Sequence, residues 1–148
     1  MRRLLAVLGA LALSACDESP RVEATVVPEL TKPVAAVRLY ALDCGRFHVK
    51  DAAMFSDEHV YDGQARDLVD PCYLIRHPRG DMMWDAGIPP AMAAEPQDKN
   101  ARATVTMKET LEQQLAELGV APSDIDYFAI SHSHYDHVGS AALFKDAT

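Results

Sequence analysis

The chain has 148 residues, of which 49% are hydrophobic and 24% are charged, and its formal net charge is −8. This length allows one domain, and the composition is that of a globular protein rather than a disordered one. The acidic balance argues against nucleic acid as a partner, because phosphate backbones are bound mainly through lysine and arginine.

Residues 1–15 have the pattern of a secretory signal peptide. Arg2 and Arg3 precede an apolar run over residues 4–13, which is shorter than the ~20 residues that a membrane-spanning helix needs. Removing residues 1–15 takes away two arginines and no acids, so the net charge of the remaining chain falls from −8 to −10. The pattern predicts that the protein is exported.

The motif Leu-Ser-Ala-Cys that ends at Cys16 resembles the lipobox of bacterial lipoproteins, in which the cysteine carries the lipid. Ordinary signal cleavage after Ala15 is the alternative. Asp17 resembles the inner-membrane retention signal known from enteric bacteria. We therefore expect a periplasmic protein that a lipid on Cys16 anchors to a membrane, with the inner membrane favoured.

Residues 16–34 contain three prolines and mixed charges without a hydrophobic period. This composition predicts a flexible tether between the lipid and a folded domain over residues 35–148. Within that domain, residues 37–42 alternate in hydrophobicity, which predicts a strand that ends at an Asp-Cys-Gly turn. Residues 46–70 are polar, and we expect them to form an irregular connection.

The apolar runs 72–76 and 82–84 flank a turn-forming segment, which predicts a β-hairpin. The second strand ends in Asp85-Ala86-Gly87, where the glycine permits a tight turn that leaves the acid at the strand terminus. Residues 89–103 are rich in proline, alanine and charge, and we expect an exposed loop there.

A helix with a buried apolar stripe is predicted after this loop. Thr106 and Glu109 fit a capping box, and Gly119 ends the run. The stripe consists of Met107, Leu111, Leu115 and Leu118. Residues 125–130 then predict a strand, so hairpin, helix and strand together indicate α/β or α+β layering.

Two cysteines, Cys44 and Cys72, remain after Cys16 is assigned to the anchor. An oxidising periplasm would permit them to form a disulfide. Since sequence does not establish that they are close together, buried free thiols are an equally open interpretation.

Three histidines and one aspartate lie within six residues directly after the last predicted strand: His132, His134, Asp136 and His137. Residues two apart on an extended segment face the same side, so His132 and His134 can face one ion while Asp136 and His137 turn toward a second. Nitrogen and carboxylate oxygen are zinc ligands. A chance surface cluster is the alternative, but unpaired polar groups beside a buried strand end are costly.

The pattern His-x-His-x-Asp-His after a strand, preceded by a strand that ends in Asp-x-Gly, resembles the metallo-β-lactamase superfamily over roughly residues 35–148. The resemblance implies the N-terminal half of an αβ/βα sandwich, an α/β (α+β) fold with two zinc ions at the edge of its sheets. It also implies that His132 and His134 bind the first zinc, that Asp136 and His137 bind the second, and that Asp85 supports the site. We expect Tyr135, inside the motif, to pack against the sheet.

Segments at residues 39–45, 55–57, 72–78 and 84–87 look most similar to the N-acyl-homoserine lactonase branch of this superfamily. Shared strand packing without a shared substrate is the alternative. The resemblance implies that two zinc ions generate a hydroxide that opens a small-molecule lactone or ester, with Asp136 as the acid/base that passes a proton to the leaving alkoxide. Hydrolysis of a β-lactam or a thioester is the alternative reaction.

The chain departs from the family pattern downstream of His137. Family members bring a further histidine, a metal-bridging aspartate and a last histidine from later sequence, whereas this chain stops at Thr148. We therefore expect an N-terminal fragment of a longer protein, and an inactive truncated fragment is a further functional alternative. The reading frame beyond Thr148 distinguishes these possibilities, while the oligomeric state is not indicated by the sequence.

Overall fold

The structure, a computed structural model, describes residues 34–148. The predicted signal peptide, Cys16 and almost all of the predicted tether lie outside the described residues. Val34, the last tether residue, is buried, so packing begins one residue earlier than expected. No helix among the described residues has the length and apolar character needed to cross a membrane.

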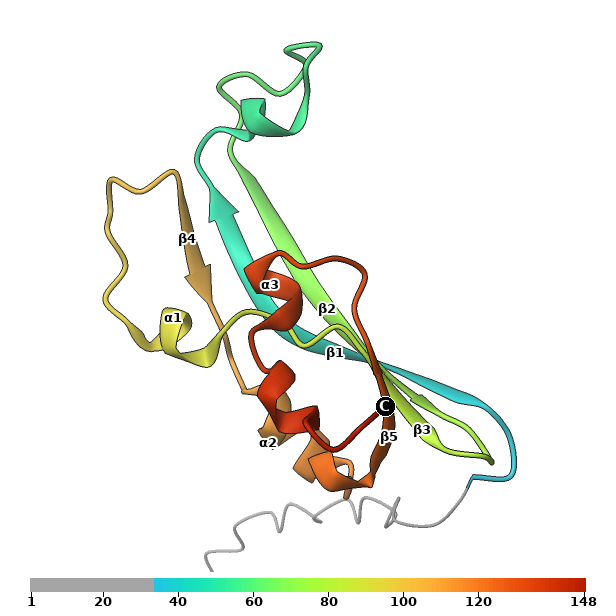
Figure 1. Ribbon diagram of the computed structural model, residues 1–148. Helices are drawn as coiled ribbons and strands as arrows, with labels where there is room; N and C mark the ends of the chain where they lie inside the picture. The colour runs from blue at the N-terminus through green and yellow to red at the C-terminus, as the bar shows by residue number, and fades with distance from the viewer. Residues whose placement is uncertain (1–33) are drawn as a thin grey trace, which may run out of the picture.

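A five-stranded mixed sheet forms the body of the protein, with the strand order β4-β1-β2-β3-β5 (Figure 1). The strands are β1 (Arg38–Val49), β2 (Arg66–Arg76), β3 (Asp81–Trp84), β4 (Ala103–Thr106) and β5 (Ile125–Ala129). Neighbours are antiparallel except β3 and β5, which run parallel. The predicted mixed α and β architecture and the hairpin β2–β3 are confirmed.

Three short α-helices accompany the sheet: α1 (Pro90–Ala94), α2 (Leu111–Glu117) and α3 (Tyr135–Val138). Three 3₁₀ helices complete the described part of the chain: η1 (Ala52–Phe55), η2 (Pro122–Asp124) and η3 (Ala141–Phe144). The presence of α1, and of β4 from Ala103 onward, means that the prediction of an exposed loop over residues 89–103 was wrong in part.

The first strand is longer than predicted. β1 continues through Asp43-Cys44-Gly45 to Val49, and β2 already begins at Arg66, so the ends of the segment 46–70 are strand rather than irregular chain. The ladder shifts register between Asp43 and Arg46. Gly45, with φ +142°, lies inside this irregularity. A bulge therefore absorbs the glycine, and pairing resumes beyond it.

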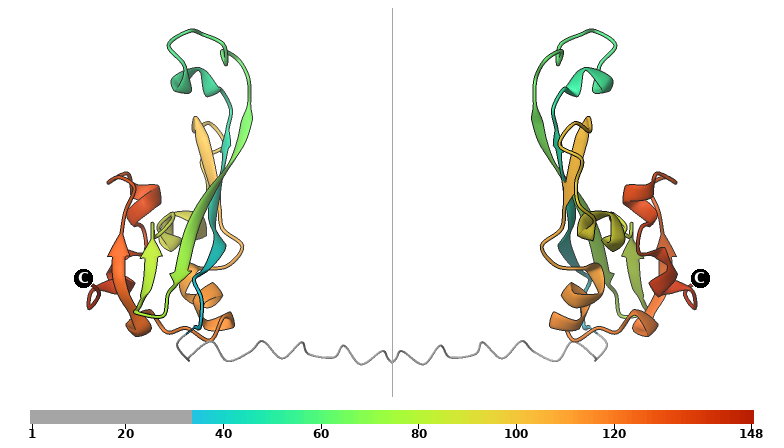
Figure 2. Two further views of the ribbon diagram at one scale, coloured as in Figure 1. Left: turned by 90° about the vertical axis from the view of Figure 1, so that its right-hand side faces the viewer. Right: turned by 90° about the vertical axis from the view of Figure 1, so that its left-hand side faces the viewer.

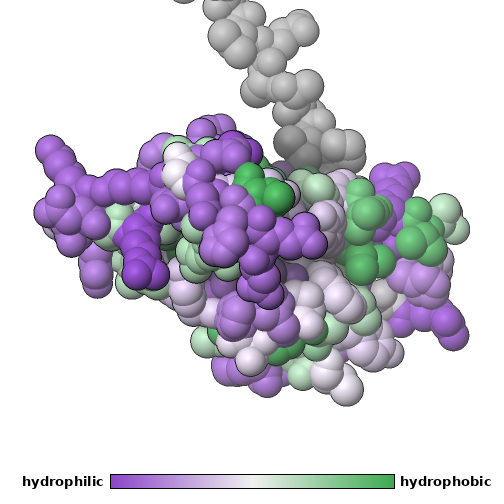
Figure 3. All heavy atoms as spheres, turned by 90° about the horizontal axis from the view of Figure 1, so that it is seen from above, coloured by the Kyte–Doolittle hydropathy of each residue, from purple (hydrophilic) through white to green (hydrophobic). Residues whose placement is uncertain are grey.

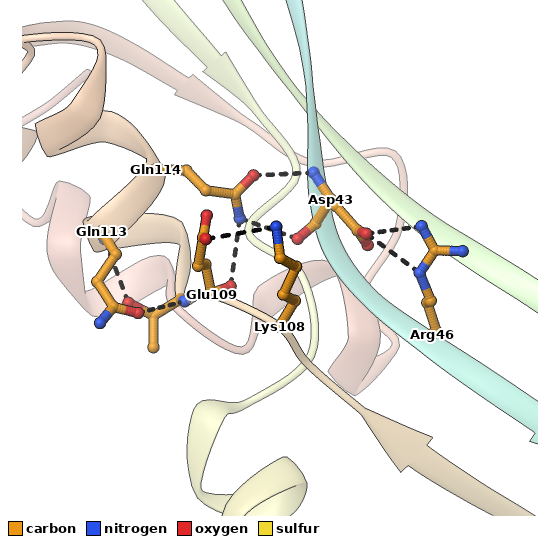
Figure 4. A network of polar contacts seen from close by, with 7 residues as sticks. Asp43, Arg46, Lys108, Glu109, Gln113 and Gln114 are labelled. Atoms are coloured by element: carbon orange, nitrogen blue, oxygen red, sulfur yellow. Dashed lines mark hydrogen bonds and ion pairs between the residues drawn. The ribbon is translucent and has the colours of Figure 1, made fainter. Parts of the chain in front are cut away.

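Helix α2 is attached to β1 at this bulge (Figure 4). The side-chain amide of Gln114 accepts a hydrogen bond from the backbone N–H of Asp43 at 3.0 Å and donates one to its backbone C=O at 2.9 Å. The same amide nitrogen donates to the C=O of Glu109 at 3.2 Å. Gln114 thus pairs both backbone groups of Asp43, which a buried or half-buried chain requires.

The start of α2 lies four residues beyond the predicted capping box. Thr110, rather than Thr106, caps the helix, and its hydroxyl and the Gln113 side chain form a reciprocal capping box. The reason is that the chain remains paired with β1 up to Thr106, which is the last residue of β4. The end of the helix is as predicted, since Gly119 follows it with φ +68°.

One face of the sheet packs against α2, η3 and the segment between β3 and α1. The core consists of Leu42, Cys44, Cys72, Leu74, Met83, Ala86, Leu111, Leu115, Val120, Ile125 and Phe144. The opposite face carries exposed apolar side chains, including Val69, Trp84 and Tyr127. The alternation of buried and exposed residues along β2 follows directly from the period of a strand.

The hairpin β1–β2 extends well beyond the rest of the molecule, and its tip stands away from the other elements (Figures 1 and 2). Four large apolar side chains near this tip are exposed: Met54, Phe55, Val60 and Tyr61. Seen from above, the surface is largely hydrophilic with separate hydrophobic patches (Figure 3).

Cys44 and Cys72 form a disulfide between β1 and β2 within the core, with a Cα–Cα distance of 5.7 Å. Replacing both cysteines by alanine is expected to lower the free energy of unfolding by about 3–4 kcal/mol, because the bridge closes a loop of 28 residues in the unfolded chain. Urea unfolding measures the change. Cys16→Ala is the control, and equal midpoints for all three proteins would contradict the prediction.

Candidate metal centre

The parallel pairing of β3 and β5 brings two predicted site segments to one edge of the sheet. Trp84 of β3 lies opposite Ala129 of β5, so Asp85 and the histidine motif leave their strands side by side. The backbone N–H of Asp85 donates to the C=O of Ala129 at 2.9 Å, which continues the ladder for one more residue. This register explains why an Asp-x-Gly motif and a histidine motif far apart in the sequence share a site.

Asp85 is the buried support of this edge. Its φ of +62° is unusual for a residue with a side chain. Its carboxylate accepts hydrogen bonds from the Ser131 backbone N–H at 2.7 Å, the Ser131 hydroxyl at 3.0 Å and His137 Nδ1 at 2.9 Å. Three donors on one buried carboxylate fix both the segment after β5 and the ring of His137.

The three imidazoles of the motif form one group. The ring centroids of His132 and His134 are 4.5 Å apart, and those of His132 and His137 are 4.1 Å apart. Ser131 Oγ lies 3.1 Å from His132 Nδ1 and 3.2 Å from His137 Nδ1. When Nδ1 of His137 donates its hydrogen bond to Asp85, the other ring nitrogen, Nε2, carries the lone pair that can bind a cation.

Two carboxylates lie beside His137. Asp136 Oδ2 is 3.6 Å from His137 Nε2. Asp70, from β2, joins them, and one ligand atom from each of Asp70, Asp136 and His137 lies within 4.8 Å of the other two. Imidazole nitrogen and carboxylate oxygen are the donors that zinc binds, so this set fits a zinc ion.

Asp70 is a site residue that the sequence analysis missed, since it lay in the segment expected to be irregular. It occupies an inward position of β2, on the same face as Cys72 and Leu74. An acid that alternates with apolar residues in this way is the signal that could have revealed it, because inward strand positions are normally apolar.

The pKa of Asp70 is raised to about 7. Burial is the main cause, and the negative charges of Asp136 and Asp85 add to it, while His137 and the backbone N–H of Ile88 oppose it. The Asp85 carboxyl shows the reverse balance. Burial alone would raise its pKa, but hydrogen bonds from Ser131 and His137 hold it below the ordinary value of 3.8.

Tyr135 lies between the histidines and β1. Its ring meets Phe47 edge-on, with the centroids 6.3 Å apart, although about half of the residue is exposed. Burial, followed by the charges of Asp136 and Asp70, raises the pKa of its hydroxyl. The ring thus contacts the sheet, as the sequence analysis expected, but remains open to solvent.

The turn after β3 holds these elements together. The N–H of Ala86 donates to the C=O of His137 at 2.8 Å, and the N–H of Gly139 donates to the C=O of Gly87 at 2.8 Å. The N–H of Ile88 donates to the C=O of Cys44 at 3.2 Å. This turn therefore connects β1, β3 and α3 directly behind the site.

The raised pKa of Asp70 predicts a pH dependence of stability in the metal-free protein. Between pH 3.8 and 7 the folded state keeps a proton that the unfolded state releases, so the contribution of Asp70 to stability falls as the pH rises through this window. Asp70→Asn removes the titration. Urea unfolding of both proteins in a chelator should show the variant gaining stability relative to the wild type as the pH rises through this window, and a constant difference would contradict this.

Residues 65–148 match the sequence profile of the family described as the Metallo-beta-lactamase superfamily. The chain belongs to the metallo-beta-lactamase superfamily. The matched range contains Asp70, Asp85 and the complete histidine motif, so the site described above lies within the family domain.

Curated relatives point to one branch of this superfamily. The chain is 28% identical over 118 residues to proteins named N-acyl homoserine lactonase AttM from Azorhizobium caulinodans and from Agrobacterium fabrum. These alignments cover 76% of this chain and 44% of each relative. The chain thus spans less than half the length of the curated relatives that it matches.

Solved structures agree with this placement. A quorum-quenching N-acyl homoserine lactone lactonase is 26% identical, with a TM-score of 0.60 over 74% of this chain and 43% of that one. An N-acyl homoserine lactone hydrolase with a bound product, at 24% identity and a TM-score of 0.63, shares the fold over 76% of this chain and 47% of its own. The chain is therefore similar in sequence and fold to lactonases of this superfamily.

Proposed function

We propose that this protein is a metal-dependent hydrolase that opens a lactone ring, with N-acyl homoserine lactones as the substrate class. One observation carries the chemistry: Asp85 orients His137 so that Nε2 turns toward Asp136, at 3.6 Å, and toward the buried Asp70. The named activity of the AttM relatives and of the lactonase structures supports the choice of substrate.

The residues that would hold two zinc ions are His132 and His134 for one and Asp136 and His137 for the other. Zinc, when bound, lowers the pKa of water and polarises a carbonyl group. Asp85 accepts a hydrogen bond from Nδ1–H of His137 and so fixes the tautomer of that ring. Asp136 is the group that can take a proton from water at Oδ2 and return it to the leaving alkoxide.

A substrate panel tests this proposal. The chain, supplied with zinc, is mixed with an N-acyl homoserine lactone, a β-lactam or a thioester, and ring opening or cleavage is followed by proton release. Turnover of the lactone alone would support the proposed substrate. Cleavage of only the β-lactam or thioester would place the activity elsewhere in the superfamily.

Metal binding without turnover is the second candidate. It is favoured by the described group of Asp70, Asp136 and His137, which offers one imidazole and two carboxylates as ligands. Zinc analysis separates the two candidates: this one predicts bound zinc with no hydrolysis of any panel member.

We further propose that the protein is anchored in the periplasm by a lipid on Cys16, at the inner membrane. The lipobox-like motif supports this, and a disulfide is typical of an oxidising compartment. Labelling with a fatty acid in a bacterial host tests it. Labelling of the wild type that is lost in the Cys16→Ser variant would support the anchor. Equal labelling of the wild type and the variant would contradict it.

A further inference from the structure

We propose that Asp70 is an additional ligand of the metal centre, which binds the same cation as Asp136 and His137. The proposal rests on the metal-dependent function proposed above and extends it, since the His-x-His-x-Asp-His motif does not include this residue. Asp70 reaches the site from the middle of the sheet, whereas Asp136 and His137 belong to α3.

Asp70 has one buried carboxylate oxygen without a partner. Asp70 is 4% exposed, and its Oδ2 atom has no hydrogen-bond donor in the structure. Among the described residues, it is the one buried side-chain oxygen or nitrogen in this condition. The backbone N–H of Ile88 interacts with the carboxyl group, but leaving Oδ2 buried and unpaired is unfavourable, so a positive partner is favourable there. A cation at this point supplies that partner.

Asp70 also lies at the right place to share a cation with Asp136 and His137. The ligand atoms of Asp70, Asp136 and His137 lie within 4.8 Å of one another. Zinc binds oxygen and nitrogen at about 2.0–2.2 Å, so two ligands of one ion are about 3–4 Å apart. The three atoms are therefore close to the spacing that one ion requires. Asp85 already orients His137, and Asp70 adds an unpartnered carboxylate oxygen to the group.

Asp70 differs in its surroundings from Asp67, the other acid of β2. Asp67 lies three residues earlier on β2, its side chain is 86% exposed, and it pairs with His48 at 2.7 Å. Asp67 thus behaves as an ordinary surface acid, satisfied by water and a neighbouring histidine. The difference between the two positions shows that β2 directs only Asp70 into the site, and it provides a matched control.

Zinc titration of the full chain tests the proposal by calorimetry, with Co²⁺ as a spectroscopic substitute for zinc. Asp70→Asn keeps the size of the side chain and removes its charge. We expect this variant to bind the cation held by Asp136 and His137 at least about 10-fold more weakly than the wild type. Loss of a group that only supports a metal ligand already has an effect of this size. We also expect a changed visible spectrum of the Co²⁺ form, while Asp67→Asn matches the wild type in both measurements.

Folding is monitored separately, by circular dichroism of the metal-free proteins. If Asp70 had only a structural role, replacing it would destabilise the metal-free protein. We expect metal-free Asp70→Asn instead to be at least as stable as the metal-free wild type. We also expect zinc to raise the thermal stability of the variant less than that of the wild type. Asp70→Ser is measured alongside it, so that the result does not depend on one replacement.

Two outcomes would overturn the proposal, and they are distinguishable. If the wild type and both Asp70 variants bind zinc with equal affinity and give equal Co²⁺ spectra, Asp70 is no ligand, while the metal centre itself stands. If the wild type binds no zinc under saturating supply, the proposed metal-dependent function fails and the role of Asp70 fails with it.

Discussion

Replacing Asp136 by alanine is expected to lower zinc affinity more than about 100-fold and to reduce lactone hydrolysis to the background rate. The reason is that Asp136 is a predicted ligand whose carboxylate lies within 4.8 Å of ligand atoms of both His137 and Asp70. Removing a group that only orients a ligand already weakens metal binding about 10–100-fold, and losing a ligand should exceed this. Zinc titration and a proton-release assay measure the two effects.

Asp146→Ala is the matched control for this prediction. Asp146 is an exposed aspartate later in the chain that pairs with the neighbouring Lys145 at the surface. Its replacement should leave both zinc affinity and hydrolysis unchanged. An Asp136→Ala protein that kept wild-type zinc affinity would show that Asp136 is not a ligand, and the assignment of the second zinc position would have to be abandoned.

Replacing Gly139 by alanine is expected to destabilise the protein by about 3 kcal/mol or more, through steric overlap rather than backbone conformation. Gly139 has φ −58° and ψ −34°, which any residue adopts. A Cβ atom at this position, however, would overlap the backbone of Gly87, Ile88 and Pro89. Since these are backbone atoms, no side-chain rotation relieves the overlap, and the contact between α3 and the turn after β3 must open. Urea unfolding measures the loss.

Gly63→Ala separates this effect from the ordinary consequence of replacing glycine. Gly63 has φ +66°, but a Cβ atom added there would meet no other atom within 4 Å, so only its left-handed backbone resists the change. We expect a loss of about 1 kcal/mol there. Equal losses for the two variants would mean that the close packing at Gly139 does not contribute to stability.

The local patterns of the sequence predicted the elements of the sheet better than their lengths. The β2–β3 hairpin and the final strand were predicted correctly because short apolar runs and the turn residues beside them are enough to specify these elements. The extension of β1 beyond Gly45 was missed. It pairs with β2 and β4 beyond a register shift, and Gln114, which binds Asp43 at that shift, is distant in sequence. The start of α2 was misplaced for a similar reason, since pairing of β4 with β1 holds Thr106 in a strand.

The candidate site divides in the same way. Spacing alone predicts His132 and His134 as candidate metal ligands, and the turn after Asp85 marks it as a candidate supporting residue. The structure adds that all three imidazoles lie together, since the ring centroid of His132 is 4.1 Å from that of His137 and 4.5 Å from that of His134. Whether each residue binds the predicted ion stays a prediction.

By itself, the sequence determined the family and the chemical character of the site, because a compact motif of histidines and aspartates needs no tertiary information to be recognised. Only the tertiary structure decided that Cys44 and Cys72 pair, and that Asp70 lies buried beside Asp136 with one carboxylate oxygen unpartnered. Both depend on which strands are neighbours, and strand order is fixed by contacts between residues far apart along the chain.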